Sequence, residues 1–297
     1  RIISNYLHFV AMCGVIMNFY EHEPISLYLD NLEEIENVHS QKQSISLMRH
    51  PWLGKVLVIN GEIQHIEAYQ ALYHELLVHL PIAFLPSISS ALIIGGGSLF
   101  AAYELLKYPS LKRVTLCDHD HEVLDLMTRH YPHAQIVLND RRFNYVEDDG
   151  WKYCKRCHDR YDLVVNDCFN LVEESKKLNF SCYDILSNLC TDSGVCVDII
   201  YRHIFDRKIT EKTLSYLHRE NGLALALVTV PEYPEILHVE IIWSKSHLVS
   251  QLITKPVNSF QRDICDGKIS SPFQFFSPKH LGFYLYLPPY IRTKFNL

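Results

Sequence analysis

The chain has 297 residues, of which 48% are hydrophobic and 21% are charged, and its formal net charge is −6 at pH 7. This is the composition of a globular protein long enough for one large domain, or for a small domain and a large one. The negative charge argues against a general nucleic-acid binder, which needs a basic surface to neutralise phosphates. Nothing in the charge pattern points to a membrane surface either.

The nine cysteines are scattered along the chain, and several lie in apolar runs, where a free thiol behaves as a small hydrophobe. Their odd number and spacing predict a reduced, cytoplasmic protein and not a disulfide framework. Residues 1–17 contain a short apolar segment that is too short, and too polar at its start, for a membrane span. We expect a buried strand or helix there, with the remnant of a targeting segment as the alternative.

The first part of the chain, up to residue 68, has the pattern of a small β domain. Strands are expected at residues 24–30, 34–39, 43–48 and 54–59. Asn60-Gly61 follows, which is the strongest short signal for a hairpin, and it leads into Glu-Ile-Gln-His-Ile. From Tyr69 to Leu80 the pattern becomes helical.

After Pro86 short apolar strands alternate with helical segments. Strands are expected at residues 91–94, 113–117, 134–138, 163–166 and 195–200, helices at 98–107, 121–129, 143–151, 183–189 and 211–219, and a last pair of strands at 223–228 and 238–243. The alternation predicts an α/β fold. Residues 69–297 would form a Rossmann-like doubly wound sheet with an antiparallel edge, as in class I methyltransferases, behind an N-terminal β domain of residues 1–68.

Polar residues follow four successive predicted strands. Gly95-Gly96-Gly97 closes the first strand, and Asp118, Asp140 and Asp167 follow the next three. Ligands of open parallel sheets bind beyond the carboxyl ends of the strands, so the set predicts a nucleotide-like ligand, although each acid alone could cap a helix. The glycine run lacks both the later glycine of the dinucleotide fingerprint and the Lys-Ser/Thr of a P-loop. An adenosine-type donor without pyrophosphate, such as S-adenosylmethionine, fits it better.

Several longer stretches resemble the spermidine synthase (aminopropyltransferase) family. They are L-G-K-V-L-V-I-N-G-E-I-Q, Y-H-E-L-L-V-H-L-P, L-I-I-G-G-G, V-T-V-P-E-Y-P with the later W-S-K, and the tail F-F-S-P-K-H-L-G-F-Y-L-Y-L-P-P-Y. They span residues 24–294 in the order found in the family. The resemblance implies a small β domain, a Rossmann-like catalytic domain, a homodimer or tetramer, and group transfer from the sulfonium of S-adenosylmethionine or its decarboxylated form without a metal.

The resemblance also assigns roles to single residues. It implies donor contacts from the glycine turn (Gly95, Gly96, Gly97), Ser98, Gln64, Tyr73, His74, Asp118, Asp140 and Arg141, with the ribose at Asp118 and the adenine near Asp140. Asp167 falls on the aspartate that orients and deprotonates the attacking amine, and Tyr233 falls on an acceptor-side tyrosine. A sulfonium already activates its neighbouring carbons, so in-line placement of the acceptor and a base suffice for the chemistry.

Departures from the family pattern point to a different donor preference and a different acceptor. The family's Gly-Gly-Gly-Asp-Gly ends here in Ser98 and Leu99, which removes a carboxylate that would repel the carboxylate of intact S-adenosylmethionine. We therefore expect the intact donor to be accepted. Tyr69-Gln70 replaces an acidic pair and Asn170 replaces another acid, which argues against a dicationic acceptor such as putrescine.

Basic residues leave an anionic acceptor open. Arg141 follows Asp140, and Arg202 follows the fifth strand, although Arg202 alone could be an ordinary surface residue. A guanidinium suits forked contacts with carboxylate or phosphate, so a phosphate-bearing acceptor is one hypothesis. Spermidine-synthase-like enzymes of microcin C-type antibiotic pathways, which act on a peptidyl-nucleotide, would fit it.

Three hypotheses for the activity stay open at this point. We favour transfer of the aminopropyl or 3-amino-3-carboxypropyl arm, because the donor frame is kept; methyl transfer and a non-catalytic binding relative are the alternatives. Retention of Asp118, Asp140 and Asp167 favours an enzyme. Cys154-x-x-Cys157-His158 matches haem attachment and half of a zinc site, but without a second ligand pair we expect coincidence.

Overall fold

The computed structural model describes residues 15–19, 27–168, 180–200, 207–217, 222–232, 238–245, 269 and 272–295. The chain divides into two compact units, Arg1–Ala71 with Thr229–Ile236, and Leu72–Val228 with Leu237–Leu297. The division falls three residues after the boundary expected from sequence, and a short later stretch belongs to the first unit. Three of the predicted site residues, Asn170, Arg202 and Tyr233, lie outside the described residues, as do residues 1–14.

The first unit contains a five-stranded antiparallel meander in the order β1-β2-β3-β4-β5. Its strands are β1 (Val15–Phe19), β2 (Leu27–His39), β3 (Ser44–His50), β4 (Gly54–Ile59) and β5 (Glu62–Ile66), followed by the 3-10 turn η1 (Glu67–Tyr69). The two strands expected at residues 24–30 and 34–39 form the single strand β2, with an irregularity between Glu34 and Glu36. Asn60 and Gly61 join β4 to β5 with φ of 53° and 84°, as a type I′ hairpin turn requires.

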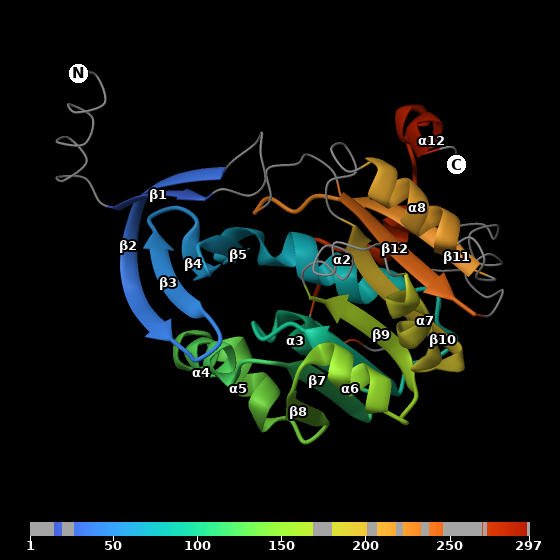
Figure 1. Ribbon diagram of the computed structural model, residues 1–297, viewed down its shortest axis with the longest axis horizontal. Helices are drawn as coiled ribbons and strands as arrows, with labels where there is room; N and C mark the ends of the chain where they lie inside the picture. Colours follow the sequence, from blue (N-terminus) through green and yellow to red (C-terminus); the bar gives the residue numbers. More distant parts are fainter. Residues whose placement is uncertain are drawn as a thin grey trace. The chain divides into compact units, whose positions relative to one another are not determined.

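The second unit is built on a seven-stranded mixed sheet in the order β11-β12-β10-β9-β6-β7-β8 (Figure 1). Its parallel strands are β6 (Ser90–Gly95), β7 (Arg113–Asp118), β8 (Phe143–Glu147), β9 (Tyr161–Asp167) and β10 (Cys190–Ile200). The antiparallel edge consists of β11 (Gly222–Val228) and β12 (His238–Ser244). The predicted fold class, a Rossmann-like sheet with an antiparallel edge behind a small β domain, is confirmed.

Helices cover both faces of this sheet. One face carries α6 (Gly150–Arg156), α7 (Ser181–Asn188), α8 (Arg207–Leu217) and α12 (Pro289–Phe295), whose apolar side chains share one core with Tyr161 and Trp243. The chain also forms α2 (Gln70–Ile82), α3 (Phe100–Leu106), α4 (His121–His130), α5 (Pro132–Asn139), η2 (Pro278–His280) and α11 (Leu281–Tyr284). In this alternation α3 connects β6 to β7, so the glycine turn leads from a buried strand directly into a helix.

In the second unit, two elements differ from the sequence prediction. Residues 134–138, expected as a strand, lie in helix α5, and residues 143–151, expected as a helix, contain strand β8 followed by the start of α6. Pro132 opens α5, where its fixed φ suits the first helical turn, and the buried side chains of His133, Ala134 and Val137 have helical spacing. Asp140 therefore precedes the strand β8 and does not follow one.

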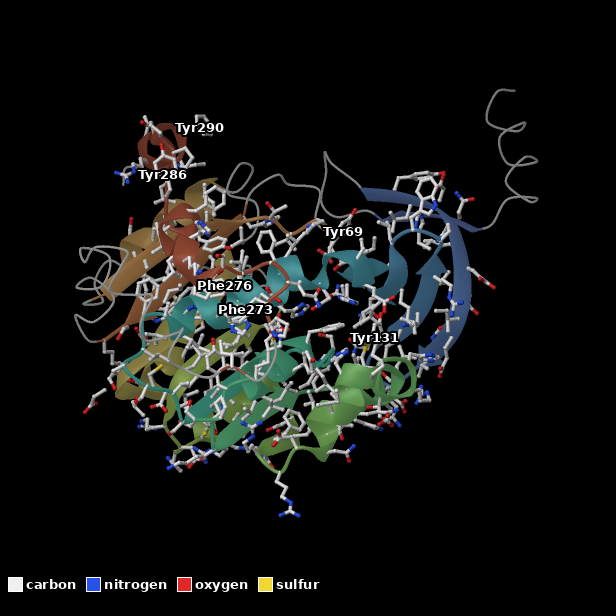
Figure 2. The ribbon with its side chains drawn as sticks, turned by 180° about the vertical axis from the view of Figure 1, so that it is seen from behind. Tyr69, Tyr131, Phe273, Phe276, Tyr286 and Tyr290 are labelled. Atoms are coloured by element: carbon white, nitrogen blue, oxygen red, sulfur yellow. The ribbon has the colours of Figure 1, made fainter. Side chains whose placement is uncertain are left out.

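Helix α2 holds the C-terminal segment of the second unit. The Glu75 carboxylate accepts hydrogen bonds from the backbone N–H groups of Gln274 (2.7 Å), Phe275 (2.7 Å) and Phe276 (2.6 Å). Figure 2 shows Phe273 and Phe276 lying over α2, where their rings pack against His79 at centroid distances of 4.5 and 5.5 Å. A buried charge thus fixes a segment about 200 residues away in sequence, because three converging N–H donors replace its lost hydration.

Candidate functional site

The glycine turn after β6 is in direct contact with the end of β9. Gly95 and Gly96 have φ of 78° and 75°, which side chains rarely adopt. A Cβ atom on Gly95 would lie 2.5 Å from the backbone oxygen of Asp167, and one on Gly96 would lie 2.8 Å from Asp167 Oδ2. Both positions therefore require glycine for conformation and for space, and the turn lies against the carboxylate of Asp167.

The turn ends in a non-glycine residue with strained backbone. Leu99 has φ of 65°, in the left-handed region, and its side chain is fully buried. Burial of a leucine side chain outweighs the strain of about 1 kcal/mol or more for a left-handed conformation. The neighbouring Ser98 is partly exposed, and its carbonyl oxygen lies 2.9 Å from His133 Nε2. The His133 ring stacks on Phe100 at 3.8 Å, which fixes the start of α3.

Asp118, the last residue of β7, connects this strand to the glycine turn by a hydrogen bond. Its Oδ2 accepts from the N–H of Gly97 at 3.0 Å, and its Oδ1 accepts from the N–H of Asp120 at 3.0 Å. Burial raises the pKa of this carboxyl group, while the two backbone hydrogen bonds act in the opposite direction. A partly buried carboxylate held rigidly beside a glycine turn suits the hydroxyl pair of a ribose.

Asp167 lies at the end of β9, and its carboxyl group combines a hydrogen bond from α2 with a raised pKa. Its Oδ1 accepts a hydrogen bond from the hydroxyl of Tyr73 on α2 at 2.8 Å. Burial raises the pKa of Asp167 to about 7; the Tyr73 hydrogen bond lowers it and the nearby charge of Asp118 raises it. A carboxylate with a pKa near the operating pH can take a proton from an attacking group, and Tyr73 orients it.

Asp140 and Arg141 do not belong to this edge of the sheet, and the prediction that Asp140 follows the third strand is wrong. Both residues precede β8. Arg142 forms hydrogen bonds of 2.6–3.2 Å with the Asp140 carboxylate and also bonds the backbone oxygens of Leu106 and Tyr108. Arg142 lowers the pKa of Asp140, so this pair is an ionic clamp between α3, α5 and β8. Arg141 is exposed.

Asp149 follows the third strand, where the sequence prediction had put Asp140. It lies two residues beyond β8 and is exposed, and its side chain accepts from the N–H of Lys152 at 2.9 Å, which caps α6. A Cβ atom on the next residue, Gly150, would lie 2.6 Å from Ile94 of β6, so the chain approaches the central strand closely here. The pair Asp149-Gly150 was the sequence signal for a turn after the third strand, but residues 143–151 were expected to be a helix.

The remaining predicted residues fall into two groups. His74 is buried on α2, with its ring 4.8 Å from that of Tyr73 and 5.0 Å from that of Phe100. Gln64 on β5 and Tyr69 in η1 are partly exposed residues of the first unit.

The sequence also raised the questions of a metal site and of a membrane span. Within the residues that the structure describes, no three His, Cys, Asp or Glu side chains are grouped to hold a metal ion, and Cys154 is buried in the core. No helix in the described ranges is long and apolar enough to cross a membrane.

The fold and the carboxylates at the strand ends define a class: Rossmann-like proteins with a nucleotide-type site at the carboxyl edge of the sheet. Residues 70–252 match the model of the spermine/spermidine synthase domain, which covers more than half of the chain. The chain therefore belongs to the spermine/spermidine synthase family.

Sequence relatives agree with this membership, and a solved structure shares the fold. A polyamine aminopropyltransferase of Agathobacter rectalis is 30% identical over 194 residues, covering 63% of this chain and 66% of the relative, and one of Buchnera aphidicola subsp. Acyrthosiphon pisum is 26% identical over 285 residues, covering 93% and 97%. A putrescine N-methyltransferase of Nicotiana attenuata is 29% identical over 202 residues, covering 66% and 54%. The matched part of the chain thus spans about two thirds or less of the length of some curated relatives and nearly the full length of others. The spermidine synthase structure of Thermotoga maritima has the same fold, with a TM-score of 0.82, 20% identity, and coverage of 95% of this chain and 94% of that one.

Proposed function

We propose that the chain is a transferase that moves the three-carbon arm of an S-adenosyl donor to an amine other than putrescine. The observation that carries this proposal is Asp167: a carboxylate at the end of β9, beside the glycine turn, held by Tyr73 at 2.8 Å and with a pKa raised to about 7. Sequence relatives that are polyamine aminopropyltransferases support the same reaction type.

The reaction needs little covalent chemistry from the protein. The donor's sulfonium makes its adjacent carbons electrophilic, so the nitrogen of the acceptor attacks the first carbon of the arm, the C–S bond breaks, and a neutral thioether leaves. In this scheme Asp118 binds the ribose hydroxyls, and the glycine turn lets the backbone approach the donor. Asp167 accepts the proton that the nitrogen loses, and Tyr73 keeps its carboxylate oriented.

The donor proposal rests on Ser98. A neutral, partly exposed hydroxyl follows the glycine turn where the family pattern has an acid. Without a negative charge at position 98, the end of the glycine turn does not repel the carboxylate of intact S-adenosylmethionine, so the transferred arm is aminopropyl or 3-amino-3-carboxypropyl, depending on the donor supplied.

The acceptor proposal rests on the lost acids at Tyr69, Gln70 and Asn170. The phosphate-bearing acceptor considered above has weaker support, since Arg141 is exposed on the segment before β8, whereas ligands bind beyond the carboxyl ends of the strands, and Arg202 lies outside the described residues. An amine acceptor agrees better with a carboxylate base at the end of β9, because Asp167 lies beside the glycine turn where the donor is proposed to bind.

Methyl transfer is the second candidate, favoured by the similarity to a putrescine N-methyltransferase. Both reactions use one donor and one base, and they differ in which carbon beside the sulfur faces Asp167.

Calorimetric titration with S-adenosylmethionine, its decarboxylated form and methylthioadenosine tests the donor site, and turnover of Asp167→Asn tests the base. We expect binding of all three compounds and a loss of turnover of roughly 10²–10⁴-fold in the variant. Absence of binding by all three would remove the transferase proposal, and undiminished turnover would remove Asp167 as its base.

A further inference from the structure

Two cysteines of β10 lie with their sulfur atoms in contact. The Sγ atoms of Cys190 and Cys196 are 3.1 Å apart, and both residues are thiols in this structure. An S–S bond is about 2.05 Å long, so the two atoms need to approach by only about 1 Å to bond. Cys190 pairs with Tyr161, the first residue of β9, whereas Asp167 is the last residue of that strand. The sulfur contact is therefore separate from the candidate functional site.

An irregularity in β10 creates this contact. The two cysteines are six positions apart, which in a regular strand amounts to about 20 Å. From Cys190 to Val195 the strand β10 advances five residues, while its partner β9 advances two, from Tyr161 to Leu163. β10 therefore carries three extra residues at this point, and they leave the ladder as a bulge. The bulge brings Cys196 back beside Cys190.

Contacts that do not involve the thiols hold the bulge in place. Gly194 lies so close to β9 that a Cβ atom there would be 2.8 Å from the carbonyl oxygen of Tyr161. The Gly194 carbonyl oxygen accepts from the Ser244 hydroxyl of β12 at 2.9 Å. The Thr191 hydroxyl donates to Asp162 Oδ1 of β9 at 3.2 Å. Because the fold itself holds the sulfur atoms together, a bond between them needs no movement of distant segments.

The two thiols differ in their access to solvent. Cys196 is 1% exposed and belongs to the core that contains Trp243, its neighbour on β12. Cys190 is partly exposed, and the bulge that follows it is exposed at Asp192 and Ser193. A small oxidant can therefore reach Cys190, with Cys196 in contact behind it. An accessible thiol beside a second thiol is the arrangement of reversible cysteine oxidation, in which the second sulfur captures the oxidised first one.

We propose that Cys190 and Cys196 form a reversible oxidation site, at which an oxidant of the peroxide class converts the two thiols to a disulfide. Hydrogen peroxide first transfers one oxygen to the Cys190 thiol, which becomes a sulfenic acid, and leaves as water. The Cys196 sulfur then attacks the Cys190 sulfur, the S–S bond forms, and the sulfenic oxygen leaves as a second water. The thiols lose two electrons and two protons, which the peroxide accepts, and a dithiol reductant returns them.

The disulfide would fix the connection between α7 and β10. Cys190 follows Leu189, the residue after α7, whose carbonyl oxygen accepts from the Tyr161 N–H at 2.9 Å. Closing the loop of residues 190–196 restricts the unfolded chain, so the oxidised protein is the more stable form. A disulfide that forms only under peroxide agrees with the sequence prediction of a reduced protein. The site makes the stability of the fold depend on redox conditions, and it does not depend on the proposed transferase activity.

The test treats the full chain with hydrogen peroxide, blocks the remaining thiols with iodoacetamide and analyses the peptides by mass spectrometry. Trypsin releases residues 178–202 as one peptide that contains both cysteines, and chymotrypsin cleaves after Tyr183 and so removes Cys182 from it. We expect the peptide with Cys190 and Cys196 to carry no alkyl group and to lack two hydrogens. Dithiothreitol added before iodoacetamide should restore alkylation of both residues.

Substitutions connect the disulfide to stability. Cys190→Ala and Cys196→Ala each remove one sulfur, and Cys157→Ala is the matched control, because Cys157 is also partly exposed and packs against the same core. Peroxide should raise the melting temperature of the unmodified protein and of Cys157→Ala by about 5 °C, and dithiothreitol should reverse the shift. Neither Cys190→Ala nor Cys196→Ala should show it.

Three results would overturn the site. They are alkylation of both Cys190 and Cys196 in the folded protein after peroxide, recovery of Cys190 as a sulfinic acid with Cys196 still alkylated, and a peroxide-dependent melting shift that both alanine variants retain. The peptide result is obtained on the unmodified protein, so it decides the question even where a substitution at the buried Cys196 prevents folding.

Discussion

Replacing Tyr73 by phenylalanine should move the pH dependence of turnover upward. The Tyr73 hydroxyl donates to Asp167 Oδ1 at 2.8 Å, and this hydrogen bond favours the ionised carboxylate. Burial raises the pKa of Asp167 to about 7 in spite of that bond. Without the hydroxyl the pKa rises further, so the fraction of enzyme with a free base at pH 7 falls.

The size of the shift follows from the strength of the lost bond. A hydrogen bond to a charged group contributes about 1.5–3 kcal/mol, and one pKa unit corresponds to about 1.4 kcal/mol. Water that replaces the hydroxyl recovers part of this, so we expect an upward shift of about one unit. In the unmodified protein kcat/KM should rise with pH through about 7 and then level off, and in Tyr73→Phe the same rise should occur near pH 8 with a similar plateau.

The assay is kcat/KM for the amine acceptor between pH 5.5 and 9.5, from initial rates at saturating donor. Tyr216→Phe is the matched control, since Tyr216 also donates to an aspartate, Asp184, but on the exposed side of α7. Its profile should coincide with that of the unmodified protein. A profile of Tyr73→Phe that keeps its midpoint near pH 7 would refute Asp167 as the titrating base.

Three other substitutions have defined outcomes. At pH 8 the free energy of unfolding in urea should be about 1–3 kcal/mol higher for Asp167→Asn than for the unmodified protein. The raised pKa of Asp167 means that the folded unmodified protein loses stability as the pH rises from about 4 to 7, and the asparagine variant does not. Equal free energies of unfolding at pH 8 would argue against the raised pKa. Glu75→Gln should lower the free energy of unfolding by about 2–3 kcal/mol, because three backbone N–H donors lose a charged acceptor, and an unchanged urea midpoint would contradict that role. Ser98→Asp should weaken binding of intact S-adenosylmethionine relative to its decarboxylated form by about tenfold in calorimetry, with Ser98→Asn as the neutral control, and an unchanged affinity ratio would place the donor carboxylate elsewhere.

Most of the fold could be predicted because its strong signals are local. β4 begins and ends where its apolar run does, and Asn60-Gly61 turns as its residue types require. In the second unit the exception was the stretch from Pro132 to Glu147, where the short apolar run of α5 fits a strand or a helix equally well. Pro132 was the feature that distinguished them, since proline favours the first turn of a helix.

The wrong placement of Asp140 follows from predicting a strand where α5 lies and a helix where β8 lies. With a strand assigned before Asp140, the aspartate seemed to end a strand, whereas it begins the approach to β8 and binds Arg142. Asp118 and Asp167 were placed correctly because β7 and β9 are continuous apolar runs that end at these acids.

The burial of Glu240 could not be predicted from the sequence. A single glutamate in His-Val-Glu-Ile-Ile-Trp-Ser has the pattern of a solvent-facing position on an edge strand. Its burial depends on the order β11-β12-β10, and its place beside Ile199 and Asp167 depends on the register of three strands that are distant in sequence.

The central claim, arm transfer at Asp167, is tested most directly by a doubly labelled donor. S-adenosylmethionine with ¹³C in the methyl group and deuterium on the arm carbon next to sulfur is incubated with the protein and an amine acceptor, and the products are analysed by mass spectrometry. We predict deuterium in the amine and ¹³C in the released methylthioadenosine. ¹³C in the amine, with deuterium kept in S-adenosylhomocysteine, would contradict the account and identify a methyltransferase.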